Sequence, residues 1–275
     1  LRGQSRYCNY FYIKLMLMTL ICYTIIFVIT PCFFIFEMII VRPVIVKHYN
    51  MCWCKDLFHV CCATFCFINV IGNMILGIIT DTSFTQNLQI ECGSYCEHCK
   101  MNRPSIAWHC KVCNVCILRR DHHCFFFSRC IGLYNRRYFV LYLVYIVSSL
   151  MYATIYNYYY IATKLGDYHL SISILRFSIP YMTCLINEPA DIKDLYVLFL
   201  MLNVGLVLWC TLLLLFHLRN TLTGLTAREY KQKRKLNLTT LKENLRSVFG
   251  ARWYFAIFWP LVDSPIPDEY ITKSL

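Results

Sequence analysis

Long apolar runs alternate with polar segments along this chain, and four of the runs are long enough to cross a bilayer as helices. A helical span needs about 20 residues, because a helix rises about 1.5 Å per residue and the hydrocarbon core is about 30 Å thick. The predicted spans cover residues 15–40, 57–80, 138–163 and 195–218. This pattern predicts an all-α polytopic membrane protein with four transmembrane helices.

The four spans divide the chain into segments on two sides of the membrane. The segments are an N-terminal tail (1–14), spans 1 and 2 with a short loop at 41–56 (15–80), a cysteine-rich segment (81–137), spans 3 and 4 with a loop at 164–194 (138–218), and a C-terminal tail (219–275). Both tails and the cysteine-rich segment share one side, which carries 21 of the 27 Lys and Arg residues. The positive-inside rule therefore predicts that this side is cytosolic and that the two loops are lumenal.

Composition and charge narrow the class of protein. Hydrophobic residues make up 58% of the chain and charged residues only 15%, whereas a soluble domain has roughly 25% charged residues. A net charge of +12 would suggest nucleic acid in a soluble protein, but here basic residues flank spans, where they meet anionic lipid headgroups. We expect a bilayer and no nucleic acid as the partner. A transporter or channel fits less well, because the ionisable residues inside the spans (Glu37, His59 and His217) form no obvious pathway.

The polar segment between spans 2 and 3 is rich in metal-binding residues. Residues 96–130 contain seven of the 18 cysteines, several of them in C-x2-C pairs. Cytosolic cysteines stay reduced, so this spacing is a strong signal for zinc. A segment this short cannot build a sizeable hydrophobic core, so metal binding would supply most of its folding energy.

The number of candidate ligands exceeds what two zinc sites need. The seven cysteines together with His109, His122 and His123 give ten candidates, and two closed tetrahedral sites use eight. If the two left over are one histidine and one cysteine, they form a base and a nucleophile, and Asp121 stands where it can orient the histidine. The spacing alone does not decide which residues are left over.

This segment resembles the cysteine-rich domain of the DHHC protein S-acyltransferases, or palmitoyltransferases. The family pattern is met by Cys96, Cys99, Arg103, Pro104, Ala107, His109, Cys110, Cys113, Cys116, Asp121, His122, His123, Cys124, Cys130, Ile131, Gly132, Asn135 and Phe139. Two spans before and two after this segment also match the family's layout, so the resemblance covers nearly the whole chain.

The resemblance implies a division of labour within the segment. One structural zinc would be held by Cys96, Cys99, His109 and Cys116, and the other by Cys110, Cys113, His123 and Cys130. His122 and Cys124 then remain for catalysis, with Asp121 behind the histidine. All of these residues would lie in a small cytosolic two-zinc domain between the second and third spans.

Two weaker family motifs follow the fourth span. In "TARE", Thr226 and Glu229 match the family's T-T-x-E and Ala227 does not; in "NLRSVFG", Asn244 matches the family's asparagine. The resemblance implies that these segments support the catalytic domain. From the sequence alone, a helix cap or turn residue is the default interpretation of Asn244.

The resemblance also implies an activity. The protein would move a long-chain acyl group from acyl-CoA, such as palmitoyl-CoA, to cysteines of membrane-associated substrate proteins, in two ping-pong steps through an acyl-cysteine on the enzyme. We expect a Golgi or endoplasmic reticulum membrane as its location. Arg119, Arg120 and Arg129 are candidates to contact the CoA phosphates, and Phe126 is a candidate to contact the acyl thioester.

The sequence departs from the family pattern directly after Cys124. Phe125 replaces a proline, Phe126 a tryptophan and Arg129 an asparagine. Phe126 keeps an apolar face but lacks the indole N–H donor. These departures leave a second interpretation open, in which the chain is a catalytically weak or inactive membrane zinc-binding scaffold of the same family.

Overall fold

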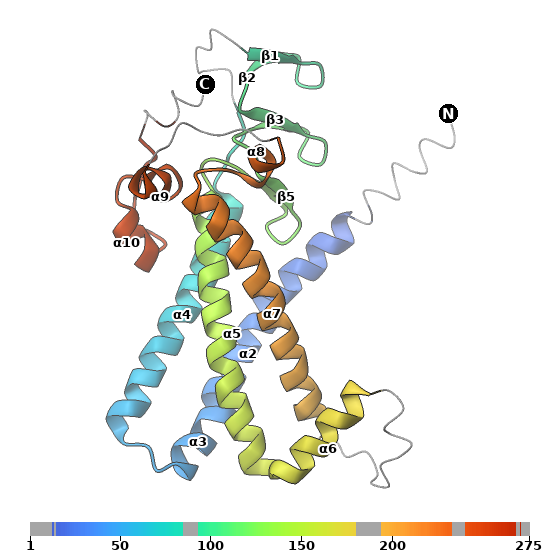
Figure 1. Cartoon of the computed structure of the whole chain (residues 1–275), viewed down its shortest axis with the longest axis vertical. Helices are drawn as coiled ribbons and strands as arrows, with labels where there is room; N and C mark the ends of the chain where they lie inside the picture. Colours follow the sequence, from blue (N-terminus) through green and yellow to red (C-terminus); the bar gives the residue numbers. More distant parts are fainter. Residues whose placement is uncertain are drawn as a thin grey trace, which may run out of the picture. The chain divides into compact units, whose positions relative to one another are not determined.

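The computed structural model of the chain describes residues 13, 15–84, 93–179, 194–232, 240–267 and 270. The predicted N-terminal tail, apart from Ile13, lies outside the described residues. Four helices are long and apolar enough to cross a membrane, as the sequence predicts (Figure 1). They are Leu15–His48, Trp53–Ile79, Arg136–Leu165 and Asp194–Leu222.

These helices contain several elements, and shorter helices connect or follow them. The first span includes η1 (Ile25–Ile29), α2 (Thr30–Phe36), η2 (Glu37–Val41) and α3 (Arg42–His48); the other spans are α4 (Trp53–Ile79), α5 (Arg136–Leu165) and α7 (Asp194–Leu222). The short helices are α6 (Asp167–Ser178), α8 (Ala227–Lys231), α9 (Leu241–Phe249) and α10 (Trp253–Phe258). Here η marks a π-helical turn, a wider turn that interrupts a regular α-helix.

The predicted loop at 41–56 is mostly helical, so that prediction was wrong. Hydropathy falls at Arg42, but the backbone hydrogen bonds continue to His48, and Asn50 then ends the helix in the left-handed region (φ 47°). The N–H of Met51 closes this end on the carbonyl of Val46 at 3.0 Å, which is a Schellman-type C-cap. Similarly, the predicted loop at 164–194 begins with helix α6 after Gly166, whose φ is 76°.

The chain divides into two compact units, and α4, α5 and α7 each contribute to both. One unit comprises Leu1–Thr30, Asn69–Tyr142 and Leu215–Leu275, and the other comprises Pro31–Ile68 and Leu143–Leu214. The first contains the cysteine-rich segment and the C-terminal helices. In the described part of the second, the regular elements are helices.

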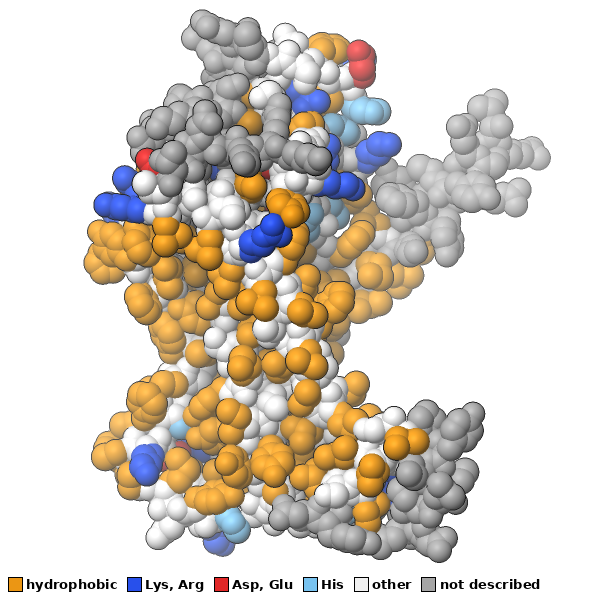
Figure 2. Space-filling model, in the orientation of Figure 1, with side chains coloured by type: hydrophobic (Ala, Val, Ile, Leu, Met, Phe, Trp, Pro, Cys, Tyr) orange, Lys and Arg blue, Asp and Glu red, His pale blue; other side chains and the backbone are white. Residues whose placement is uncertain are grey.

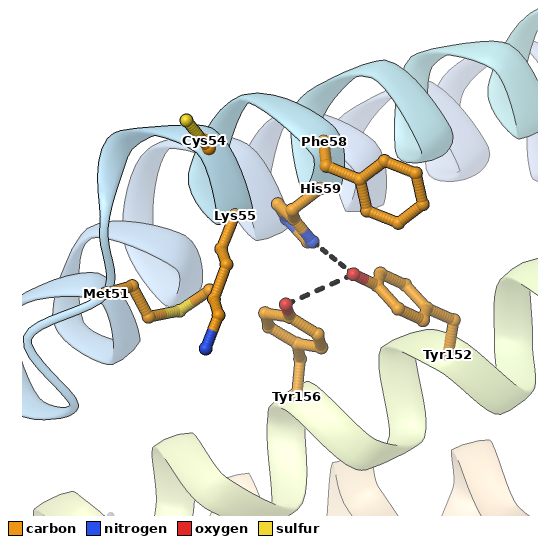
Figure 3. A pocket seen from close by; sticks show the side chains of 7 residues that line it. All are labelled: Met51, Cys54, Lys55, Phe58, His59, Tyr152 and Tyr156. Carbon is orange, nitrogen blue, oxygen red and sulfur yellow. Dashed lines mark hydrogen bonds between the residues drawn. The ribbon is translucent and has the colours of Figure 1, made fainter.

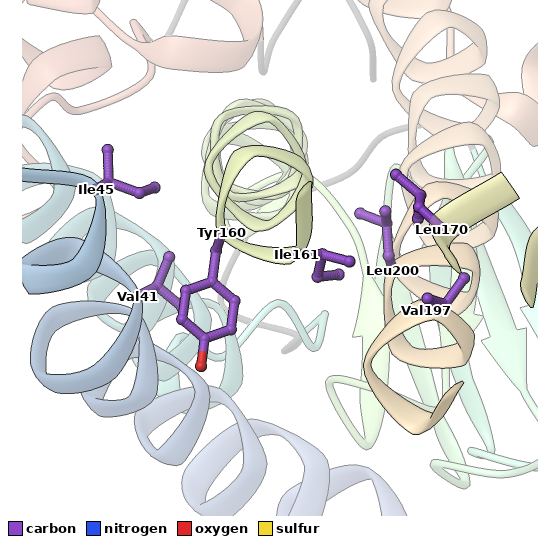
Figure 4. Packing of buried hydrophobic residues seen from close by; sticks show 7 residues of the cluster. All are labelled: Val41, Ile45, Tyr160, Ile161, Leu170, Val197 and Leu200. Carbon is purple, nitrogen blue, oxygen red and sulfur yellow. The ribbon is translucent and has the colours of Figure 1, made fainter. Parts of the chain in front are cut away.

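The second unit has an apolar core, and polar side chains near it are paired with one another. Its core consists of Val41, Ile45, Tyr160, Ile161, Leu170, Val197 and Leu200 (Figure 4). Beside it, the buried Glu37 accepts a hydrogen bond from Nδ2 of Asn157. Arg42 binds both carboxylate oxygens of Asp56 at 2.6 Å. Pairing of this kind is what polar groups require in an apolar medium.

In the first unit, the cysteine-rich segment forms three short antiparallel hairpins, so the all-α description is too narrow. The strands are β1 (Gly93–Cys96) with β2 (Met101–Pro104), β3 (Ala107–Cys110) with β4 (Val115–Leu118), and β5 (His122–Cys124) with β6 (Arg129–Ile131). Strands of three or four residues are too short to show an alternating hydrophobic pattern, which is why the sequence does not reveal them. Tight turns at Lys100 and Asn114, both with positive φ, join the first two pairs.

Asn135 joins the third hairpin to the ends of two spans. Its Oδ1 accepts from the N–H of Gly132 at 2.8 Å, and its Nδ2 donates to the carbonyls of Cys130 at 3.0 Å and Gly77 at 3.2 Å. The side chain is fully buried. It therefore fixes the start of α5 against β6 and the end of α4.

Large apolar side chains cover the outer faces of the spanning helices. On α7, for example, Leu208, Trp209 and Leu212 are each more than 60% exposed, and hydrophobic side chains spread over the helices in Figure 2. Exposed apolar surface of this extent does not suit water. It is the surface expected of helices that contact lipid.

We predict that Asn135→Ala lowers stability markedly. The substitution leaves the buried Gly132 N–H and two carbonyls without their partner, and each unsatisfied buried group costs about 1–3 kcal/mol. Thermal unfolding in detergent should show a clearly lower Tm than for wild type. Asn102→Ala, at an exposed position of β2, is the matched control; an equal Tm for both variants would contradict the role of Asn135.

Candidate functional site

The first candidate metal cluster lies between the first two hairpins. The ligand atoms of Cys96, Cys99, His109 and Cys116 lie within 4.8 Å of one another. His109 stands directly opposite Cys116 in the β3–β4 register, and opposed residues of an antiparallel pair have adjacent side chains. The β1–β2 turn supplies the other two cysteines, and the Sγ of Cys99 lies 3.3 Å from Nδ1 of His109.

The second cluster joins the β3–β4 turn to the third hairpin. Its members are Cys110, Cys113, His123 and Cys130, again with ligand atoms within 4.8 Å. His123 stands opposite Cys130 in the β5–β6 register, and the Sγ of Cys113 lies 3.3 Å from Nδ1 of His123. These are the two ligand sets that the resemblance implies.

Both clusters fit a closed tetrahedral zinc site. Three sulfurs and one imidazole nitrogen are a common structural zinc set, and a Zn–S bond of about 2.3 Å places sulfurs about 3.8 Å apart. The Sγ atoms of Cys99 and Cys116 lie 3.7 Å apart, and those of Cys113 and Cys130 lie 3.8 Å apart. Among the described residues, the geometry therefore supports both cysteine–histidine clusters as metal sites.

Asp121, His122 and Cys124 lie at the third hairpin, where Asp121 directly precedes β5. Neighbouring side chains of a strand alternate between its faces, so His123 points to the metal cluster while His122 and Cys124 share the other face of β5. Nδ1 of His122 lies 2.9 Å from Oδ2 of Asp121. Asp121 is 5% exposed and Cys124 is partly exposed, an arrangement that suits a buried orienting carboxylate and a reachable thiol.

Hydrogen bonds and nearby charges favour the protonated imidazole of His122 and the ionised carboxylate of Asp121. Burial disfavours the charged imidazole of His122, but its hydrogen bonds with Asp121 and Cys124 outweigh burial and raise its pKa to about 9. Burial likewise works against the Asp121 carboxylate, yet the hydrogen bond with His122 and the nearby charge of Arg136 hold the pKa of Asp121 below its ordinary value. At neutral pH His122 therefore holds a proton as an imidazolium beside the Asp121 carboxylate, and it can retain a proton that it takes from the neighbouring thiol.

The chain's C-terminal segment completes the surroundings of Asp121. The backbone N–H of Ala227 donates to Oδ1 of Asp121. Thr226 and Glu229 form a capping box at the start of α8, with bonds of 3.1 Å and 2.7 Å. Because position 227 contacts Asp121 through its backbone, the alanine that departs from the family motif keeps this contact.

Asn244 has a different local role from the one its sequence suggests. It lies inside α9, whose N-cap is Thr240, so it is neither a cap nor a turn residue. Its Nδ2 donates to the carbonyl of Leu222, the last residue of α7, at 2.7 Å. The carbonyls at a helix C-terminus lack intrahelical partners, and Asn244 satisfies one of them while joining α9 to α7.

The three candidate arginines occupy different environments. Arg119 is 3% exposed and pairs with Glu229 at 3.2 Å, so it could reach a phosphate only by giving up this buried ion pair. Arg120 donates to Sγ of Cys130 at 3.3 Å, where it offsets the negative charge of a three-thiolate site. Arg129 is partly exposed and donates through Nη1 to the carbonyl of Thr80 at 2.5 Å.

The three phenylalanines after Cys124 are not equivalent. Phe125 and Phe126 are nearly half exposed, whereas Phe127 is buried against the rings of Phe139 and Tyr142. Gly77 on α4 makes room for Phe127, since a Cβ there would lie 2.2 Å from the phenylalanine ring. Phe127 thus anchors the loop, and its two neighbours are left beside the thiol.

His217 on α7 is a residue that the sequence analysis did not assign to the site. It is buried, and its Nδ1 lies 3.6 Å from Oδ2 of Asp121, the oxygen that also contacts His122. Its ring packs edge-on against Phe139. The only sequence signal is a histidine near the end of the fourth span, which has no partner in the sequence pattern.

Comparisons with known proteins indicate the family of the chain. The family model described as DHHC palmitoyltransferase matches residues 89–234. The chain is 28% identical over 215 residues to the probable palmitoyltransferase ZDHHC24 of Rattus norvegicus, covering 76% of each protein. It is 29% identical over 221 residues to the palmitoyltransferase ZDHHC22 of Danio rerio, covering 74% of this chain and 76% of that protein.

We predict about two zinc ions per chain in the purified protein, since each cluster offers a complete tetrahedral ligand set. Cys116→Ser and Cys110→Ser should each lower the zinc content, the first through the first cluster and the second through the second. Elemental analysis against protein concentration measures this. Cys124→Ser is the matched control and should keep wild-type zinc; a loss of zinc in this variant would make Cys124 a ligand.

Proposed function

Because the chain belongs to the DHHC palmitoyltransferase family, we propose that it is a protein S-acyltransferase that moves a long-chain acyl group from acyl-CoA to protein cysteines. The observation that carries the proposal is the arrangement of Asp121, His122 and Cys124 beside two candidate metal clusters. A carboxylate that orients an imidazole next to a thiol is the arrangement that activates a cysteine nucleophile.

The first step would form an acyl-enzyme. His122 takes the proton of the Cys124 thiol, and the thiolate attacks the carbonyl carbon of the acyl-CoA thioester. The tetrahedral intermediate then collapses, the bond to the CoA sulfur breaks, and the CoA thiolate leaves with the proton from His122. Cys124 now carries the acyl group as a new thioester.

The second step would repeat this chemistry on a substrate protein. His122 takes the proton of the incoming cysteine thiol, whose sulfur attacks the acyl carbonyl, and Cys124 leaves and regains a proton. Asp121 remains ionised throughout and holds the imidazole, while His217 and the N–H of Ala227 hold Asp121. The chemistry thus exchanges one thioester for another and needs no oxidant or other co-reactant.

Zinc would stabilise the fold of the domain in this proposal. Each cluster offers four protein ligands, which leaves no open position for water or substrate. The metals would be held by the two clusters, and the ordered hairpins keep His122 and Cys124 on the same strand face. No proton or acyl transfer passes through the metal sites.

The surroundings of Cys124 suit a lipid substrate. Exposed Phe125 and Phe126 give an apolar surface beside the thiol, and burying a 16-carbon chain is worth on the order of 10 kcal/mol. Arg129 has guanidinium donors beyond the one bound to Thr80 and is the best placed of the three arginines to contact a CoA phosphate. The substrates would be membrane-associated proteins with cytosolic cysteines, at a Golgi or endoplasmic reticulum membrane.

We predict that Cys124 becomes acylated when the purified protein is incubated with an alkyne analogue of palmitoyl-CoA. The label should be released by hydroxylamine and should be absent from Cys124→Ser. Cys61→Ser, at an exposed cysteine of α4, is the control and should label like wild type. Absence of label on folded, zinc-loaded wild type would favour the inactive scaffold over the enzyme.

We also predict that the two neighbouring histidines fail in different ways. His122→Ala should keep its zinc and fold but label roughly 100- to 10,000-fold more slowly, which is the range for loss of a general base. His123→Ala should lose zinc and have a lower Tm, and any loss of labelling should follow from this loss of structure. Labelling rate, zinc content and Tm of both variants test this; equal loss of zinc in the two would contradict the assignment.

A further inference from the structure

A pocket of about 360 Å³ lies in the second unit, between the first turns of α4 and the middle of α5 (Figure 3). Its polar lining consists of Lys55 and His59 from α4 and Tyr152 and Tyr156 from α5, while Met51 and Phe58 contribute apolar surface. None of these residues belongs to the site around Cys124. The pocket is therefore unexplained by the proposed acyl transfer.

The side chains of His59, Tyr152 and Tyr156 form a hydrogen-bonded chain. It has three donor hydrogens but only two hydrogen bonds, so one donor hydrogen is left without an acceptor. Nδ1 of His59 lies 2.6 Å from the hydroxyl of Tyr152, which lies 3.1 Å from the hydroxyl of Tyr156. Each neutral group carries one donor hydrogen, and two links use two of the three. The hydroxyl of Tyr152 donates to that of Tyr156, so Nδ1 of His59 donates to Tyr152, and the donor that remains is the Tyr156 O–H.

The remaining donor has no acceptor within the described part of the chain. Tyr156 is partly exposed and lines the pocket, so a group that enters the pocket can reach its O–H. Nε2 of His59 is buried and is the unprotonated nitrogen in this arrangement, so it takes no part in binding an anion.

The charge at the pocket is positive. Lys55 is exposed, and none of the lining residues is acidic. The adjacent Asp56 does not neutralise Lys55, because both of its oxygens bind Arg42 at 2.6 Å. An ammonium group and the O–H donor of Tyr156 therefore line the same pocket, and together they select an anionic acceptor.

The position of the pocket at the start of a membrane span indicates where the anion comes from. α4 begins at Trp53, so Lys55 lies in its first turn, where a span meets the headgroup layer. Phe58, on the rim, is 70% exposed and would lie along an acyl chain. A ligand with a phosphate at one end and hydrocarbon at the other matches both parts of the lining.

We propose that this pocket binds the phosphate group of a membrane phospholipid. Lys55 contacts the phosphate, the surplus donor of the chain formed by His59, Tyr152 and Tyr156 donates to a phosphate oxygen, and the acyl chains follow the apolar face of α4. The site is distinct from acyl transfer and does not depend on the proposed function.

Native mass spectrometry of the detergent-solubilised full chain tests the site, with dioleoyl phosphatidic acid as the probe. Dioleoylglycerol, which has the same chains without the phosphate, should bind far more weakly. Lys55→Gln and Tyr156→Phe should each weaken phosphatidic acid binding about tenfold, the loss expected for one hydrogen bond to a charged group. Equal binding of the two lipids would overturn the proposal.

Matched variants separate the pocket from general charge. Lys47→Gln removes an exposed lysine at the end of α3, and Tyr158→Phe removes an exposed hydroxyl from α5; both should bind like wild type. If Lys47→Gln weakens binding as much as Lys55→Gln, the pocket is not the site. Inorganic phosphate is the second probe. If inorganic phosphate fails to displace the lipid, the result supports a phospholipid as the ligand. Full displacement would instead indicate that the pocket binds a free anion.

Discussion

Strand β5 is three residues long, and its side chains must alternate between two faces. The middle residue, His123, enters the second metal cluster, so His122 and Cys124 on either side of it must point the other way. The same rule separates the neighbours His109 and Cys110 at the end of β3 and sends them to different clusters. The metal-binding clusters and the pair beside Asp121 are therefore consequences of one backbone geometry, and a shift of one residue in register would exchange their members.

Asp121 connects this hairpin to parts of the chain that are distant in sequence. Its two oxygens face His122, His217 and the N–H of Ala227. Burying a carboxylate is costly unless its charge is compensated, so the end of α7 and the start of α8 have to be in place for the site to form. The ion pair between Arg119 and Glu229 fixes α8 from the other side.

Much of this organisation could be predicted from the sequence, for identifiable reasons. Helices long and apolar enough to cross a membrane stand where the sequence predicts the four spans, because the bilayer sets their length and hydropathy. The two sets of cysteine and histidine residues named from the family pattern lie close together among the described residues. The helical turns at Arg42–His48 could not be predicted from hydropathy, since a charged residue can continue a helix when Asp56 pairs with it. His217 could not be found either, because its proximity to Asp121 depends on how α7 packs and not on any local spacing.

The polar groups within the spans show why the pocket at the start of α4 differs from ordinary packing. The carboxylate of Glu37 accepts from Asn157, and Arg42 meets both oxygens of Asp56, so donors and acceptors are matched in these pairs. The chain from His59 to Tyr156 is not matched, since three neutral groups make two links. The Tyr156 hydroxyl accepts from Tyr152 and keeps a hydrogen of its own, which no described residue accepts. The surplus hydrogen beside the ammonium group of Lys55 is therefore best understood as a feature for binding an anion.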